Sequence, residues 1–123
     1  MPEHKELSEN TVRWITQDPF STTVSLYDID FQHILEHHPN MRKNEEAIKE
    51  TVIEPDSIYI DSESEKRRAY YKSKTSATYS DKLKTKVILE DESKTWTDAR
   101  VVTAFPVKKE GEPDVRKIYE HSD

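Results

Sequence analysis

The chain has 123 residues, of which 36% are charged, and its formal net charge at pH 7 is −6. It contains no cysteine, which excludes disulfide frameworks, thiolate zinc sites and cysteine nucleophiles. Its single glycine, Gly111, excludes glycine-rich phosphate loops, the nucleophile elbow and the dinucleotide fingerprint. There is no apolar run of the roughly 20 residues that a membrane span needs, and the polar start lacks the apolar core of a signal peptide. We therefore expect one cytoplasmic domain without membrane contact.

The start of the chain predicts a tail and a pair of strands. Residues 1–10 are polar and are predicted to form a flexible tail. Short β-branched and aromatic runs follow at residues 11–16 and 22–27, separated by a turn-rich break. This pattern is typical of a β-hairpin or of two short strands.

Two helices are predicted next. Residues 28–38 show the helical spacing, and the predicted buried stripe consists of Phe31, Ile34, Leu35 and His38. Pro39 disfavours helical geometry at the residue before it, so the helix should end there. A second helix should start near Asn40 or Asn44 and run through "EEAIKETVI" until Pro55 stops it.

The remaining chain predicts strands. The runs "SIYID", "RRAYYK", "KTKVILE" and "ARVVTAF" are joined by polar linkers, as in an antiparallel meander. Residues 107–123 are mostly charged and are predicted to form a C-terminal tail, in which only residues 115–119 suggest a short element. Helices grouped before strands predict an α+β fold, with N-terminal helices packed on a roughly four-stranded antiparallel sheet. The predicted domain covers residues 11–106.

The stretch "HILEHHPNM", residues 33–41, carries a histidine cluster with several interpretations. Its first five letters match H-x-x-E-H, in which His33 and His37 would bind zinc and Glu36 would activate a zinc-bound water. Pro39 ends the helix directly afterwards, and no downstream motif offers a third ligand. We therefore expect no catalytic metal and no cofactor. The structural alternative is a helix end with His38 packed inward and the other two histidines facing solvent.

The position of these histidines also predicts their chemistry. His37 and His38 lie in the last turn of the predicted helix, where a cation meets the negative end of the helix dipole. This should raise their pKa values and favour a proton donor near neutrality.

Basic residues gather between residues 66 and 86, where Asp81 is the one acidic residue. A locally basic surface on an acidic protein can hold a polyanion such as RNA. The alternative is that these side chains protect strand edges, since lysine discourages edge-to-edge pairing.

The order of several short motifs resembles a known family. His-Pro at residues 38–39 is followed by Pro-Asp-x-Ile at 55–58, Tyr-Tyr-Lys at 70–72 and Val-Val-Thr-Ala-Phe at 101–105. Over residues 24–105 this order resembles the phage-associated branch of the barnase–EndoU–colicin–RelE superfamily of small metal-independent RNA nucleases. The resemblance implies N-terminal helices on a four-stranded antiparallel sheet, and a nuclease or nuclease-toxin role in a phage or mobile element.

The resemblance also suggests site residues by position. His33 and His38 match helix positions that are basic in the family, Thr103 matches a hydroxyl on the last strand, and Tyr71 with Lys72 matches an aromatic-basic strand. His37 stands at a place that is often basic.

The predicted activity is RNA cleavage by attack of the 2′-hydroxyl on the adjacent phosphorus, which gives a 2′,3′-cyclic phosphate. This needs a base, an acid and cations around the phosphorane. Either His33 or His37 would act as base or acid, with His38 as a further candidate, and Thr103 would donate a hydroxyl. The predicted phosphate-binding residues are Arg68, Lys72 and Lys86, and the tyrosines predicted to stack on bases are Tyr70, Tyr71 and Tyr79.

Alternatives remain for both function and partners. The main alternative is a non-catalytic RNA- or protein-binding module of the same fold. The predicted partner is RNA, with transfer RNA as one candidate, and an inhibitor or antitoxin protein is a second candidate partner.

Overall fold

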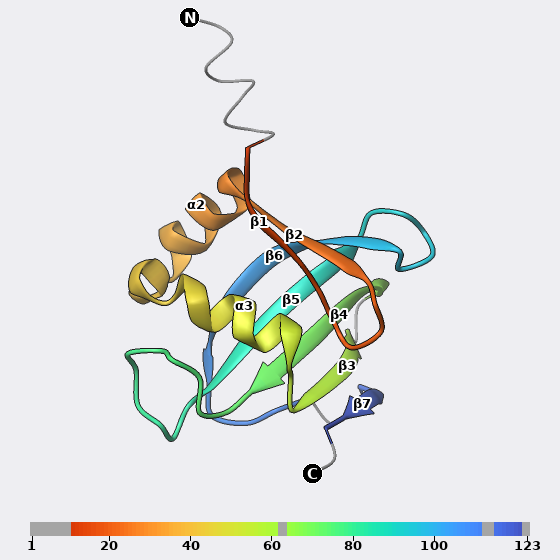
Figure 1. Ribbon diagram of the computed structural model, residues 1–123. Coiled ribbons are helices and arrows are strands. Elements are labelled where there is room, and N and C mark those ends of the chain that lie inside the picture. Colours follow the sequence, from red (N-terminus) through yellow and green to blue (C-terminus); the bar gives the residue numbers. More distant parts are fainter. Residues whose placement is uncertain (1–10, 62–63, 112–114, 122–123) are drawn as a thin grey trace, which may run out of the picture.

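The computed structural model describes residues 11–61, 64–111 and 115–121, which form one curved sheet with helices against one face (Figure 1). The predicted tail at residues 1–10 lies outside the described residues. The helices are α2 (Asp28–His37), the 3₁₀ helix η1 (Pro39–Lys43) and α3 (Glu45–Ile53). The strands are β1 (Val12–Gln17), β2 (Thr23–Tyr27), β3 (Ser57–Asp61), β4 (Ser64–Lys72), β5 (Lys84–Asp91), β6 (Asp98–Val107) and β7 (Lys117–Glu120).

The predicted four-stranded antiparallel sheet is wrong, because the described residues form a seven-stranded sheet in the order β1-β2-β6-β5-β4-β3-β7. The early hairpin joins the meander through a parallel pairing of β2 with β6, in which Val24 lies opposite Ala99. Strand β7, from the segment predicted as a charged tail, pairs with β3 at the other edge. Local patterns indicated strands at β1 to β6 and only a short element at β7, and a pairing partner far along the chain depends on tertiary burial.

The inner face of the sheet carries the core. Tyr70 of β4 lies opposite Val87 of β5, which lies opposite Ala104 of β6, and all three are buried. Apolar side chains of α2 and α3, including Ile34 and Ile48, belong to the same cluster. Each large side chain fully removed from water contributes roughly 1.5–3 kcal/mol, so this burial holds the helices on the sheet.

A β-bulge in β6 decides which way its last residues point. Ile88 of β5 lies opposite Thr103, while Leu89 lies opposite Val101, so one extra residue stands on β6 at this place. Val101 and Ala104 are therefore both buried although they are three residues apart. It follows that Thr103 lies on the outer face of the sheet.

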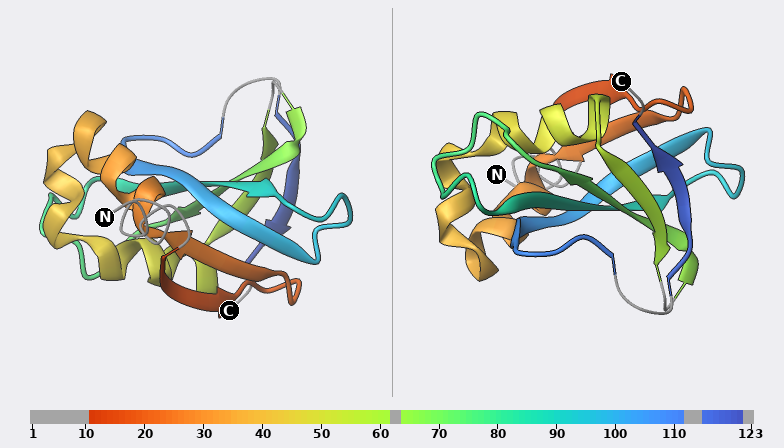
Figure 2. Two further views of the ribbon diagram at one scale, coloured as in Figure 1. Left: turned by 90° about the horizontal axis from the view of Figure 1, so that it is seen from above. Right: turned by 90° about the horizontal axis from the view of Figure 1, so that it is seen from below.

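The sheet is strongly curved (Figure 2). Its curvature brings the β1–β2 turn close to β7, although these elements belong to opposite edges of the sheet. The rings of Phe20 and Tyr119 meet edge to face at a centroid distance of 5.7 Å. Helix α2, which starts directly after β2, contacts β6.

Candidate functional site

A row of side chains crosses the outer face of the sheet at the end of α2. Tyr71 of β4 lies opposite Lys86 of β5, and Lys86 lies opposite Phe105 of β6. The Lys86 ammonium lies 5.5 Å from the ring centroid of Tyr71 and 5.6 Å from that of Phe105. The imidazole of His38 stacks on Phe105 at a centroid distance of 4.7 Å and an interplanar angle of 20°. We call Tyr71, Lys86, Phe105 and His38 the Lys86 cluster.

Thr103 belongs to the same face as the Lys86 cluster. It stands two residues before Phe105 on β6, and residues two apart on a strand share a face. Its partly exposed side chain lies opposite Ile88, the neighbour of Lys86 two residues along β5. An imidazole from the C-cap of α2, an ammonium from β5 and a hydroxyl from β6 therefore lie on one side of the sheet.

The electrostatics of His38 differ from the expectation based on the helix dipole. Burial of the ring lowers the pKa of His38 below its ordinary value of 6.5, and the neighbouring charge of His37 lowers it further. The predicted rise in pKa is therefore wrong for His38. This residue is the C-cap of α2 and packs against Phe105, where loss of water disfavours the charged imidazolium. A neutral imidazole at pH 7 is suited to accept a proton.

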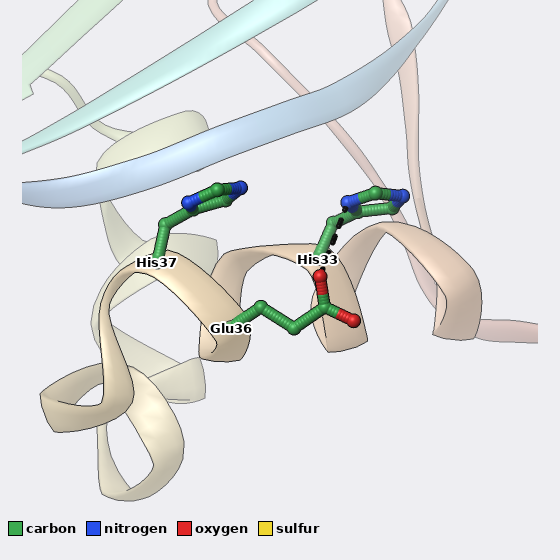
Figure 3. A group of neighbouring side chains, drawn as sticks. All are labelled: His33, Glu36 and His37. Carbon is green, nitrogen blue, oxygen red and sulfur yellow. Dashed lines mark ion pairs between the residues drawn. The ribbon is translucent and has the colours of Figure 1, made fainter.

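His33 and His37 lie apart from this packing. Both are exposed on α2, and Nδ1 of His33 lies 3.8 Å from a carboxylate oxygen of Glu36. Figure 3 shows the two imidazole rings rising from the same side of the helix, with the Glu36 carboxylate beside them. The ligand atoms of the three residues all lie within 4.8 Å of one another, so this group could hold a metal ion.

The tyrosines predicted to stack on bases are largely enclosed. Tyr71 is only 2% exposed and Tyr70 is fully buried, where its hydroxyl bonds to the carboxylate of Asp18. Tyr79 is partly buried and its hydroxyl bonds to Thr85. Lys86, Phe105 and His38 are therefore the partly exposed members of the Lys86 cluster, while the buried ring of Tyr71 lies beside Lys86.

Two predicted phosphate ligands point to the inner side of the sheet. Arg68 and Lys72 alternate with Tyr71 along β4, so they leave it on the opposite face. The Arg68 guanidinium lies 4.0 Å from the ring centroid of Trp96. Lys72 donates from Nζ to the carbonyl of Glu54 at 2.7 Å, at the C-terminal end of α3. The structure thus brings Lys86 into the cluster with His38 but not Arg68 or Lys72.

The run of basic residues between 66 and 86 does not form one surface. Arg67 is paired with Glu90 at 3.1 Å, and Lys84 lies 3.9 Å from Glu110. Because neighbouring strand positions face opposite sides, a basic run in the sequence is divided between both faces of the sheet.

Phe105 is the member of the cluster that the sequence prediction missed. The sequence did contain a signal for Phe105. It follows Thr103 by two positions on the same predicted strand, and side chains two positions apart on a strand lie on the same face. The contact with His38 could not be predicted, because it depends on how α2 lies against β6.

Comparison of the chain with protein-family models, curated proteins and solved structures finds no match. Within the described ranges, no helix is long and apolar enough to cross a membrane.

Proposed function

We propose that this protein is a metal-independent endoribonuclease whose active centre combines the Lys86 cluster with Thr103 and His37. The observation that carries the proposal is that His38 and Lys86 both lie against the ring of Phe105 on an accessible face. Such a pair offers a proton acceptor and a phosphate-binding cation next to an aromatic surface on which an unpaired base can stack.

The proposed reaction needs no metal because the nucleophile belongs to the substrate. His38 takes the proton from the ribose 2′-hydroxyl, and the 2′-oxygen attacks the adjacent phosphorus. The bond from phosphorus to the 5′-oxygen breaks, and the leaving oxygen takes a proton from the His37 imidazolium. The products are a 2′,3′-cyclic phosphate and a 5′-hydroxyl.

The charge of the phosphorane would be stabilised by two groups. Lys86 supplies a positive charge to a non-bridging oxygen, and Thr103 donates its hydroxyl. The lowered pKa of His38 supports its role as the base, since the imidazole is neutral at pH 7. The burial of Tyr71 supports a positioning role, with its ring fixing Lys86.

The test is cleavage of a single-stranded RNA oligonucleotide by the purified chain in excess EDTA. We expect products with cyclic phosphate ends, and no cleavage where the 2′-hydroxyl at the cut position is replaced by hydrogen. General acid–base catalysis contributes roughly 10²- to 10⁴-fold, so His38→Gln should lower kcat by at least about 100-fold.

Variants of two lysines provide the matched comparison. Lys86→Ala should lower kcat/KM strongly, whereas Lys66→Ala removes an exposed lysine of β4 and should have little effect. Cleavage that requires an added metal, or that is unchanged in His38→Gln, contradicts the proposal. RNA binding without cleavage would instead support the alternative of a non-catalytic binding module.

A nuclease of this kind would act in the cytoplasm on RNA, with transfer RNA as one candidate substrate. The resemblance of the motifs to phage-associated nucleases supports an origin in a phage or mobile element. An inhibitor protein, if the host element encodes one, would have to cover Lys86 and His38.

A further inference from the structure

One side of α2 presents two imidazoles and a carboxylate at metal-ligand spacing. His33 and His37 are separated by one helical turn, and Glu36 lies between them in sequence. Their candidate ligand atoms all lie within 4.8 Å of one another. Tetrahedral zinc, with ligands at about 2.0–2.1 Å, needs ligand atoms about 3.4 Å apart. Because the three side chains are exposed, rotation about their side-chain bonds can close this difference without moving the backbone.

The donor set selects the class of metal. Imidazole nitrogens favour borderline cations such as Zn²⁺, Cu²⁺ and Ni²⁺, whereas Mg²⁺ and Ca²⁺ prefer sites made of oxygen ligands. Two imidazoles and one carboxylate leave one position of a tetrahedral ion to water.

The place of this group on the helix also favours a cation. His37 lies in the last turn of α2, where the unpaired carbonyls give the helix its negative end. The three side chains make no hydrogen bond to other described residues, and the 3.8 Å separation between His33 and Glu36 is longer than a hydrogen bond. Metal binding would therefore break no existing hydrogen bond.

We propose that His33, Glu36 and His37 form a surface binding site for one Zn²⁺ ion. This site is distinct from a peptidase centre, because Glu36 serves as a ligand and Pro39 ends the helix directly after the cluster. His37 belongs to both proposals, but the inference does not rest on the proposed nuclease, since metal binding is measured directly. The RNA assay is run in EDTA, which leaves the His37 imidazole free of metal.

The experiment is calorimetric titration of the metal-free chain with Zn²⁺ at pH 7.5. We expect saturable binding of one equivalent, and no comparable binding of Mg²⁺. Losing a group that only orients a metal ligand costs roughly 10- to 100-fold in affinity, so losing a ligand itself should cost at least about tenfold. His33→Gln and His37→Gln should each show that loss, and Glu36→Gln should show a weaker one.

Two control variants separate this site from other groups. Glu46→Gln makes the same charge change at an exposed position of α3, and His121→Gln removes a histidine outside the cluster. Both should bind Zn²⁺ as the unmodified chain does. Thermal unfolding gives a second readout, because a ligand that binds only the folded state raises Tm. Zn²⁺ should raise the Tm of the unmodified chain but not that of the His33→Gln/His37→Gln double variant.

The outcomes are decisive in either direction. Absence of saturable Zn²⁺ binding overturns the proposal, as does equal affinity in the double variant. Because all three side chains are exposed, the variants should unfold at the same urea concentration as the unmodified chain. A loss of Zn²⁺ binding in a variant that unfolds normally is then due to the missing ligand and not to unfolding.

Discussion

At the scale of single residues, three histidines within six positions have different environments. His33 and His37 are exposed on α2, whereas His38 is the C-cap and stacks on Phe105. The adjacent residues His37 and His38 thus differ in environment, since the first imidazole faces solvent and the second packs on an aromatic ring. The proposed roles depend on this difference, with the shielded His38 as the proton acceptor and the exposed His33 as a metal ligand. His37 is the proposed proton donor in the metal-free protein and a ligand when the metal is bound.

The packing of His38 predicts a response of its pKa to mutation. Phe105→Ala removes the ring that shields the imidazole and should raise the pKa of His38 toward its ordinary value of 6.5. His37→Gln should also raise it, because a neighbouring positive charge is lost. NMR titration of the imidazole proton signals measures both effects, and His33→Gln is the control that should leave the pKa of His38 unchanged.

The same shift fixes the sign of a pH effect on stability. Because the pKa of His38 is lower in the folded state than in the unfolded state, the unfolded chain binds a proton more readily. The contribution of His38 to the free energy of unfolding is therefore fully present above the ordinary value of about 6.5 and is lost as the pH falls from there through the lower pKa of the folded state. Urea unfolding between pH 7.5 and pH 5.5 should show a smaller loss for His38→Gln; an equal loss would contradict the assignment.

At the scale of elements, helix α2 is fixed to β6 by a partly buried ion pair. Arg100 of β6 donates from Nε at 3.0 Å and from Nη2 at 2.6 Å to one carboxylate oxygen of Asp30, which is 8% exposed. This pair holds the helix along the strand that carries Thr103 and Phe105. The position of His38 on Phe105 thus depends on a contact between residues 70 positions apart in the chain.

Arg100→Met should destabilise the protein by about 2 kcal/mol, because it leaves the Asp30 carboxylate enclosed without its cation. This is less than the roughly 3–5 kcal/mol for a fully buried pair, since the Arg100 side chain is 32% exposed. The matched variant Arg67→Met breaks the exposed pair with Glu90 and should cost less than about 1 kcal/mol. Urea unfolding measures both changes, and equal losses would show that the Asp30 pair does not fix α2.

At the scale of the whole molecule, curvature links the first and last described strands. The ring of Phe20, in the turn between β1 and β2, meets the ring of Tyr119 in β7. This contact joins the two edges of the sheet, so the early hairpin and the C-terminal strand should unfold together with the rest.

A double-mutant cycle tests this link. Phe20→Ala and Tyr119→Ala should show a coupling free energy of about 0.5–1.5 kcal/mol, as is typical of aromatic pairs. The control cycle combines Phe20→Ala with Tyr79→Ala, since no ring contact joins these residues among the described part of the chain. Its coupling should stay within about 0.5 kcal/mol of zero. If both cycles give zero, the two edges are not coupled through these rings.

The accuracy of the sequence prediction also depended on scale. Periodicity located α2 and α3 closely, and strands β1 to β6 lie where strand-like runs were identified, whereas β7 lies in the segment predicted as a charged tail with one short element. The sheet prediction failed because β2 pairs in parallel with β6, and the paired residues, such as Thr23 and Asp98, are 75 positions apart in the chain. Strand alternation alone could not predict that Lys86 and Arg68 lie on different faces of the sheet, because this also depends on the register between β4 and β5.

The sequence by itself determined the local elements, since helical and strand periods and the position of Pro39 act within a few residues. It also determined the spacing of His33, Glu36 and His37, because one helical turn brings these three side chains together. Only the tertiary structure decided that β2 joins β6, that the bulge in β6 turns Thr103 and Phe105 outward, and that His38 is shielded from water. These features depend on long-range register and on burial against partners distant in the chain, which no local pattern specifies.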